Sequence, residues 1–125
     1  MKVEFLTPLR VEKNNGDWRV LDNFVYSVDG TIAFVEAGYL TDFASVPRLP
    51  FTYAVAGNVS HKAPLIHDYL YGQQENRKWA DQVFLAALEA EGVPNWKRWL
   101  MYAAVRVFGN SAYAAKTEPV EVPPP

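Results

Sequence analysis

The sequence predicts an α+β domain, in which a small N-terminal antiparallel β-sheet is covered by three C-terminal helices. Two observations lead to this prediction. Apolar residues alternate with other residues on both sides of Asp29–Gly30, a dipeptide typical of a two-residue β-hairpin turn. From residue 60 onward, apolar residues recur at the three- and four-residue spacing of amphipathic helices. A sheet with one apolar face must be covered, and only these later segments can cover it.

The first 40 residues are expected to form the sheet. Residues 3–13 mix β-forming residues with Pro8, which favours an edge strand or two short strands. Asn14–Gly16 predicts a turn, and residues 18–28 are then expected to form one half-buried strand before the Asp29–Gly30 hairpin. Residues 39–48 are predicted to be a loop, because nearby prolines break any helix there.

Three helices are expected after this loop. Ser60 is predicted to cap the first helix, and the polar connection Gly72–Asn76 is short enough to make the first two helices antiparallel neighbours. Gly92 and Pro94 separate the second helix from the third, which Gly109 is expected to end.

The third helix has an unusually wide distribution of apolar residues. One face is marked by Trp96, Trp99, Leu100, Ala103 and Val107, whereas Tyr102, Val105 and Phe108 lie off that face. Such a helix is either deeply buried or presents its second side to a partner. Its apolar-rich segment is too short to span a bilayer.

The composition limits the classes of function. A chain of 125 residues is expected to form one domain, here residues 1–116, followed by a Pro-rich extended tail at 117–125. The absence of Cys excludes disulfides, thiolate metal sites and a cysteine nucleophile. The formal charge of −2 and pI near 5.6 indicate no nucleic-acid partner. The N-terminus has no signal-peptide core, so synthesis in the cytoplasm is expected.

The residues most suited to catalysis are His67, Asp81 and Tyr71. His67 and Tyr71 are four residues apart and share a face of the first helix, while Asp81 belongs to the apolar stripe of the second. If the two helices are antiparallel, Asp81 can lie beside His67, where a carboxylate fixes the imidazole tautomer of a general base. The alternative is a purely structural hydrogen bond between buried His67 and Asp81.

Three further candidates lie near this pair in the sequence or in the preceding loop. Asp68 could bind a hard cation such as calcium together with Asp42 and a backbone carbonyl. Arg48, held by Pro47, could bind a carboxylate or phosphate, or could form an ion pair that fixes the loop. Ser45 is a further candidate on the same loop. No P-loop, HExxH or GxSxG motif is present.

Three segments in order, TDFASVPR, APLIHDYLYG and RKWADQVFLAALEAEGVPNWKRWLMYAAVRVFG, resemble a family of small phage and prophage proteins of unknown function. The similarity covers roughly residues 39–109. Its motifs include the candidates named above, from Asp42, Ser45 and Arg48 to His67, Asp68, Tyr71 and Asp81. The resemblance implies a phage origin and carries no established activity.

A second, local resemblance covers only the first two helices. HDYLY followed by ADQVF is similar to the HDxxY helix and later Asp of phospholipases of the A-two type. This resemblance implies that His67 activates water, Asp68 binds calcium, Asp81 orients His67, and Tyr71 supports the arrangement. Those enzymes supply further calcium ligands from a Gly-rich loop, and TDFASVPR is not such a loop.

Two functions of different class follow from the sequence. The first is a virion or assembly component that binds another phage structural protein, or itself, through the aromatic third helix and the Pro-rich tail. The second is a phage hydrolase that acts on host envelope lipid or a related ester, with membrane contact expected only in this case. The sequence favours the first, because it shows a base and an orienting carboxylate but no recognisable oxyanion-binding group or nucleophile.

Overall fold

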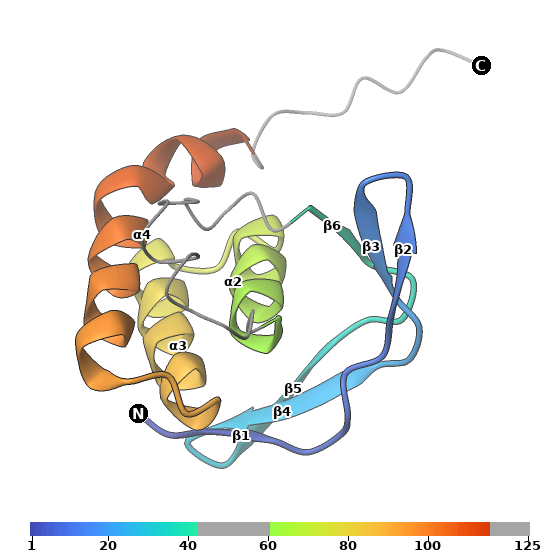
Figure 1. Ribbon diagram of the computed structural model, residues 1–125, viewed down its shortest axis with the longest axis horizontal. Coiled ribbons are helices and arrows are strands. Elements are labelled where there is room, and N and C mark those ends of the chain that lie inside the picture. The colour runs from blue at the N-terminus through green and yellow to red at the C-terminus, as the bar shows by residue number, and fades with distance from the viewer. Residues whose placement is uncertain (43–60, 116–125) are drawn as a thin grey trace.

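The computed structural model describes residues 1–42 and 61–115. Within these ranges six short strands precede three helices, as Figure 1 shows. The elements in chain order are β1 (Val3–Phe5), β2 (Val11–Asn14), β3 (Asp17–Val20), β4 (Phe24–Val28), β5 (Thr31–Val35), β6 (Leu40–Thr41), α2 (Lys62–Gly72), α3 (Arg77–Ala90) and α4 (Asn95–Ala115). The predicted α+β class is therefore confirmed.

The strands form two antiparallel three-stranded sheets, with the orders β1-β4-β5 and β2-β3-β6. In the first, β4 and β5 pair from Phe24 with Val35 to Val28 with Thr31, which confirms the predicted hairpin. Asp29 and Gly30 both have positive φ, at 49° and 84°, as a tight hairpin turn of this hand requires. The region 3–13 forms two short strands, one in each sheet.

The expectation of one continuous strand over residues 18–28 is wrong, because β3 ends at Val20 and β4 begins in the other sheet. The polar residues between them bond to other segments instead of continuing a ladder. Arg10 Nη1 lies 2.5 Å from Asp22 Oδ2, and the Ala37 amide donates to Asn23 Oδ1 at 2.8 Å. The single predicted sheet is therefore divided in two.

Helix α2 begins at Lys62, and His61 at its N-terminal boundary makes no capping hydrogen bond with its side chain. Ser60, the predicted cap, lies outside the described residues. An amide group in the first turn of α2 finds its acceptor in a side chain far along the sequence. The Ala63 amide donates a hydrogen bond to Glu91 Oε1 at 2.7 Å. Glu91 follows α3, so this bond joins the end of α3 to the start of α2.

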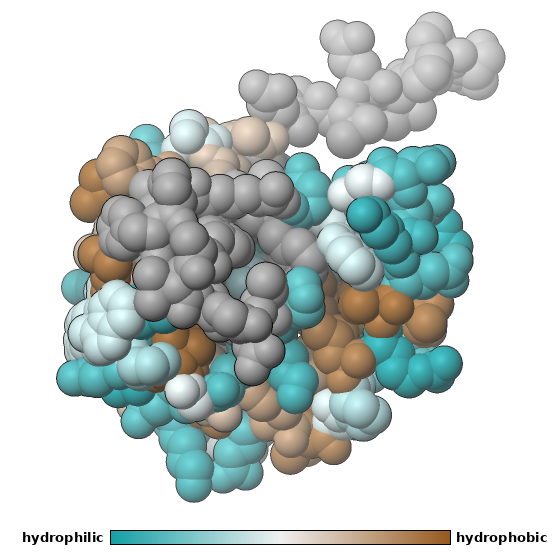
Figure 2. Space-filling view, in the orientation of Figure 1, coloured by the Kyte–Doolittle hydropathy of each residue, from teal (hydrophilic) through white to brown (hydrophobic). Residues whose placement is uncertain are grey.

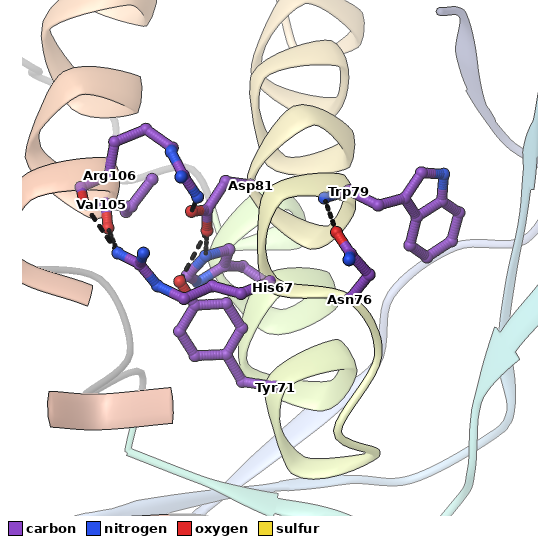
Figure 3. A network of polar contacts seen from close by, with 8 residues as sticks. His67, Tyr71, Asn76, Trp79, Asp81, Val105 and Arg106 are labelled. Carbon is purple, nitrogen blue, oxygen red and sulfur yellow. Dashed lines mark hydrogen bonds and ion pairs between the residues drawn. The ribbon is translucent and has the colours of Figure 1, made fainter. Parts of the chain in front are cut away.

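The connection between α2 and α3 is short, as predicted, and α3 has its own cap. Asn76 Oδ1 accepts a hydrogen bond from the Trp79 amide at 3.0 Å (Figure 3). This satisfies one of the amide groups that a helix leaves without an internal partner in its first turn. The two helices consequently lie as neighbours, which brings Asp81 to His67.

The prediction that Gly109 ends the third helix is wrong, because α4 continues to Ala115. Gly109 is buried, and a Cβ atom there would lie 2.7 Å from Tyr71 Oη and 3.2 Å from Arg77 Nη2. The glycine therefore permits a close approach between α4 and the two preceding helices, and it does not act as a stop signal.

The described residues share one hydrophobic core, to which the strands and all three helices contribute buried side chains. It includes Phe24, Tyr26 and Val35 from the sheets and Leu65, Ile66, Phe84 and Leu88 from the helices. Figure 1 shows α4 on the side of α3 that faces away from the strands. Helix α3 packs against β1 and α2, whereas α4 packs mainly against α3.

The helix face marked by Trp96, Trp99 and Val107 points outward. These side chains are 57%, 52% and 68% exposed, while Met101, Ala104 and Val105 of the same helix are buried. The apolar residues do share one face of the helix, but the face that packs inward is the opposite one. Helix α4 thus has one apolar face that packs inward and a second apolar face that is exposed. In the described part of the chain, no helix has the length and apolar character needed to cross a membrane.

Candidate functional site

The carboxylate of Asp81 lies at the centre of a hydrogen-bonded network that joins all three helices (Figure 3). Asp81 Oδ1 is 2.6 Å from His67 Nε2 and accepts a second bond from Tyr71 Oη at 2.6 Å. Asp81 Oδ2 accepts from Arg106 Nη1 at 2.7 Å. The structure therefore brings together His67, Tyr71 and Asp81 as the sequence predicted, and it adds Arg106 from α4.

The helical spacing explains how these groups meet. His67 and Tyr71 lie one turn apart on α2, with ring centroids 4.1 Å apart, so both reach the same side of the helix. The ring of Phe84, one turn after Asp81 on α3, packs 4.9 Å from the His67 ring. An apolar wall thus holds the imidazole against the carboxylate.

The network is fully enclosed except at one residue. The side chains of His67 and Asp81 are 0% exposed, and Tyr71 is equally buried, whereas the Arg106 side chain is 33% exposed. A buried carboxylate is costly unless charged or polar groups compensate it. Here an imidazole, a phenol and a guanidinium together provide that compensation.

The pKa of Asp81 reflects this balance. Burial by itself would raise the pKa, but the hydrogen bonds from His67, Tyr71 and Arg106 outweigh burial and hold the pKa below its ordinary value of 3.8. Asp81 is therefore a carboxylate at neutral pH. The same contact raises the pKa of the Arg106 guanidinium.

An ion pair with Asp81 alone would raise the pKa of His67, but this pKa is lowered. Burial lowers it below 6.5, and this effect exceeds the opposing effect of the Asp81 contact. His67 is consequently neutral at pH 7. Because Asp81 is ionised and can only accept, Nε2 must carry the ring proton, and the basic lone pair is on Nδ1. This is the tautomer that a general base needs when a carboxylate holds its other nitrogen.

Tyr71 acts as a hydrogen-bond donor in this arrangement. Burial and the bond to Asp81 raise the pKa of its hydroxyl, so the phenol keeps its proton. Its ring packs edge-on against Tyr113 of α4 at 5.2 Å between centroids. Tyr71 thus supports Asp81 through a hydrogen bond in which the phenol is the donor.

Arg77 and Arg106 are the residues that sequence reasoning missed. Arg77 Nη2 donates to the backbone carbonyls of Val105 and Arg106, at 2.9 and 2.7 Å. These bonds fix the turn of α4 from which the Arg106 side chain extends. From the sequence alone, Arg106 is interpreted as a residue that keeps an apolar helix soluble. The available signal was the inward-facing Asp81, since a buried carboxylate needs a cationic partner.

Asp68 belongs to a different contact from the one at Asp81. Its Oδ2 accepts hydrogen bonds from Tyr39 Oη at 2.5 Å and from Thr41 Oγ1 at 2.8 Å. These bonds attach β6 and the residue before it to α2. Asp42 is exposed, and the charges of Asp68 and Asp42 both contribute, after burial, to a raised pKa of Tyr39.

The described residues do not by themselves make a calcium site. Calcium takes about six to eight oxygen ligands, whereas this region offers two carboxylates, one of which faces two hydroxyl donors. Within residues 1–42 and 61–115, no three or more His, Asp or Glu residues are grouped so as to hold a metal ion. The metal expected at Asp68 and Asp42 therefore stays a prediction. Ser45 and Arg48 lie outside the described residues.

Comparison with known proteins gives a family and no activity. No curated protein and no solved structure matches the chain. A family model described as "Protein of unknown function (DUF1353)" matches residues 18–105, which is more than two thirds of the chain. The match contains His67, Tyr71 and Asp81 and ends one residue before Arg106. The chain belongs to the DUF1353 family of proteins of unknown function.

Proposed function

We propose that this protein is an ester hydrolase in which His67 is the general base and Asp81 orients it. The observation that supports this proposal is the 2.6 Å contact between His67 Nε2 and an Asp81 carboxylate whose second oxygen is bonded to Arg106. This contact fixes the neutral imidazole as the Nε2-protonated tautomer, in which the basic atom is Nδ1.

The reaction follows from this tautomer. Nδ1 of His67 takes a proton from water as the water oxygen attacks the ester carbonyl, and Asp81 stabilises the imidazolium that forms. Collapse of the tetrahedral intermediate breaks the bond to the leaving alkoxide, which receives the proton from Nδ1. The products are an acid and an alcohol, and the enzyme returns to its starting state.

The substrate class comes from the resemblance of HDYLY and ADQVF to phospholipases, which favours an ester of host envelope lipid. Arg48 remains the candidate for binding an anionic group of such a substrate. Because His67 is 0% exposed, catalysis requires the surrounding chain to open when substrate binds.

The first experiment compares release of fatty acid from anionic phospholipid vesicles with hydrolysis of a short-chain soluble ester. Wild type and His67→Gln are assayed at equal folded fraction. The proposal predicts hydrolysis by wild type and none by His67→Gln. The proposal would be rejected if wild type hydrolysed neither the phospholipid nor the soluble ester. Equal rates for wild type and His67→Gln would also reject it.

A second function is favoured by the outer face of α4. Trp96, Trp99, Val107 and Phe108 are 57%, 52%, 68% and 60% exposed, and Figure 2 shows hydrophobic surface at the left edge, over α4. Exposed tryptophans are frequent anchors of protein interfaces. This supports the candidate role of a phage assembly component that binds another phage structural protein or a second copy of itself.

The paired substitution Trp96→Ser and Trp99→Ser tests the second function. Under this proposal the variant stays folded but no longer joins phage particles or self-associates, as measured by co-sedimentation with particles and by analytical ultracentrifugation. Unchanged behaviour in both measurements would reject it.

A further inference from the structure

We propose that Arg106 is a positioning residue of this site: by bonding Asp81 Oδ2 from α4 it holds the carboxylate that in turn holds the His67 imidazole. The catalytic consequence rests on the proposed hydrolase function. The effect on His67 itself does not, so it can be measured without any substrate.

The division of donors at Asp81 gives Arg106 this role. Oδ1 is bonded by His67 and Tyr71 from α2, whereas Oδ2 is bonded by Arg106 Nη1 from α4 at 2.7 Å. In the part of the chain that the structure describes, Oδ2 has no other donor. Arg106 therefore holds the second carboxylate oxygen from α4, while the two groups of α2 hold the first.

The charges around His67 indicate what the loss of Arg106 should change. The described charged groups that act on its ring are Asp81 and Arg77 from α3 and Asp68 from its own helix. Arg106 neutralises Asp81 through an ion pair, so the site needs no proton on His67 to balance the carboxylate. Without Arg106, a fully buried carboxylate would lose its cation, and protonation of the adjacent imidazole would become favourable.

The backbone of α4 is fixed at the same position. Arg77 bonds the carbonyls of Val105 and Arg106, and Gly109 lets the helix approach Tyr71 closely. The Arg106 side chain thus extends from an anchored turn. It is also the one member of this network that reaches the surface, so replacing it opens no fully enclosed cavity.

The test is a pH titration of the His67 imidazole by NMR in wild type, Arg106→Gln and Arg106→Lys. Lys78→Gln is the matched control, because it removes an exposed cation from α3 outside the network. We expect about a tenfold rise in the proton affinity of His67 in Arg106→Gln. Arg106→Lys keeps the charge but has a different donor geometry and is expected to restore part of the wild-type value. Lys78→Gln should match wild type.

The activity readout separates this inference from the proposed function. If the protein hydrolyses esters, the acid limb of the pH–rate profile should move to higher pH in Arg106→Gln, with the rate recovering at alkaline pH. An unchanged His67 titration in folded Arg106→Gln would overturn the inference even if esters are hydrolysed. A raised proton affinity without hydrolysis would uphold the inference and reject the hydrolase. If Arg106→Gln does not fold, Arg106→Met takes its place, because it also removes the cation but keeps an unbranched side chain. An unchanged His67 titration in that variant overturns the inference.

Discussion

His67 Nε2 and Asp81 Oδ1 lie 2.6 Å apart, although 14 residues and a turn between two helices separate them in sequence. Both side chains are fully buried, and the carboxylate is also bonded to Tyr71 and Arg106. The contact can serve as a catalytic dyad or as a structural link between helices. The two roles differ in what happens when His67 is replaced.

The first prediction concerns folding. His67→Ala removes one donor from the buried Asp81 carboxylate and should lower the free energy of unfolding by about 1–3 kcal/mol, while His67→Gln should retain more of it through its amide donor. Urea denaturation measures both. Equal stability of His67→Ala and wild type would show that the contact contributes nothing to the fold.

The second prediction concerns pH. The pKa of folded His67 is lowered from 6.5, so the unfolded chain binds more protons below that pH. The stability that His67 contributes is complete above pH 6.5 and is lost as pH falls from there toward the lowered pKa. The free energy of unfolding should decrease by at most about 1.4 kcal/mol per pH unit from this group.

Removing the titrating group checks this assignment. The dependence between pH 6.5 and 5 should be weaker in His67→Gln than in wild type, because this variant lacks the buried imidazole. The lowered pKa of Asp81 adds a further loss of stability below pH 3.8. A steeper loss in His67→Gln than in wild type would contradict the prediction.

The third prediction concerns Gly109. In Gly109→Ala, the new methyl group would lie 2.7 Å from Tyr71 Oη, so Tyr71 or α4 must shift. Overpacking of this kind costs about 1–3 kcal/mol, against a gain of about 1 kcal/mol in helix propensity. The free energy of unfolding should fall relative to the exposed control Asn110→Ala. A Gly109→Ala protein as stable as this control would show that the close approach is unimportant.

Much of the fold could be predicted from local signals. The Asp29–Gly30 turn, the polar Gly72–Asn76 connection and the inward position of Asp81 each depend on a few neighbouring residues, and each was predicted correctly. Such features are encoded in turn chemistry and helical periodicity. The contact of Asp81 with His67 followed from them, because an antiparallel pair of helices has few alternatives.

The errors share a different origin, since each depends on long-range packing. The strand predicted for residues 18–28 divides because Asp22 and Asn23 bond to distant segments. Gly109 looked like a helix end, but Tyr71 and Arg77 occupy the space where its Cβ would be. The third helix had two apolar faces, and spacing alone could not tell which one meets α3. The contact of Arg106 with Asp81 could not be predicted for the same reason, because it depends on which face of the helix meets α3.

The fourth prediction concerns calcium. The phospholipase resemblance predicts that calcium raises the melting temperature through binding at Asp68. The described contacts predict otherwise, because Asp68 Oδ2 faces the hydroxyls of Tyr39 and Thr41. We expect equal melting temperatures in millimolar calcium and in chelator. We also expect Asp68→Asn to lose about 1.5–3 kcal/mol of stability in both. A rise with calcium that Asp68→Asn abolishes would establish the metal site.

The central claim is that His67 is the base of a hydrolytic site, and kcat/KM of His67→Gln beside His61→Gln tests it most directly. Gln can donate a hydrogen bond to Asp81 but cannot take up a proton at neutral pH. With both variants shown to be folded, we predict a loss of about 10²- to 10⁴-fold in His67→Gln and wild-type values in His61→Gln. Wild-type hydrolysis in folded His67→Gln would contradict the claim and leave the His67–Asp81 contact as a structural link between α2 and α3.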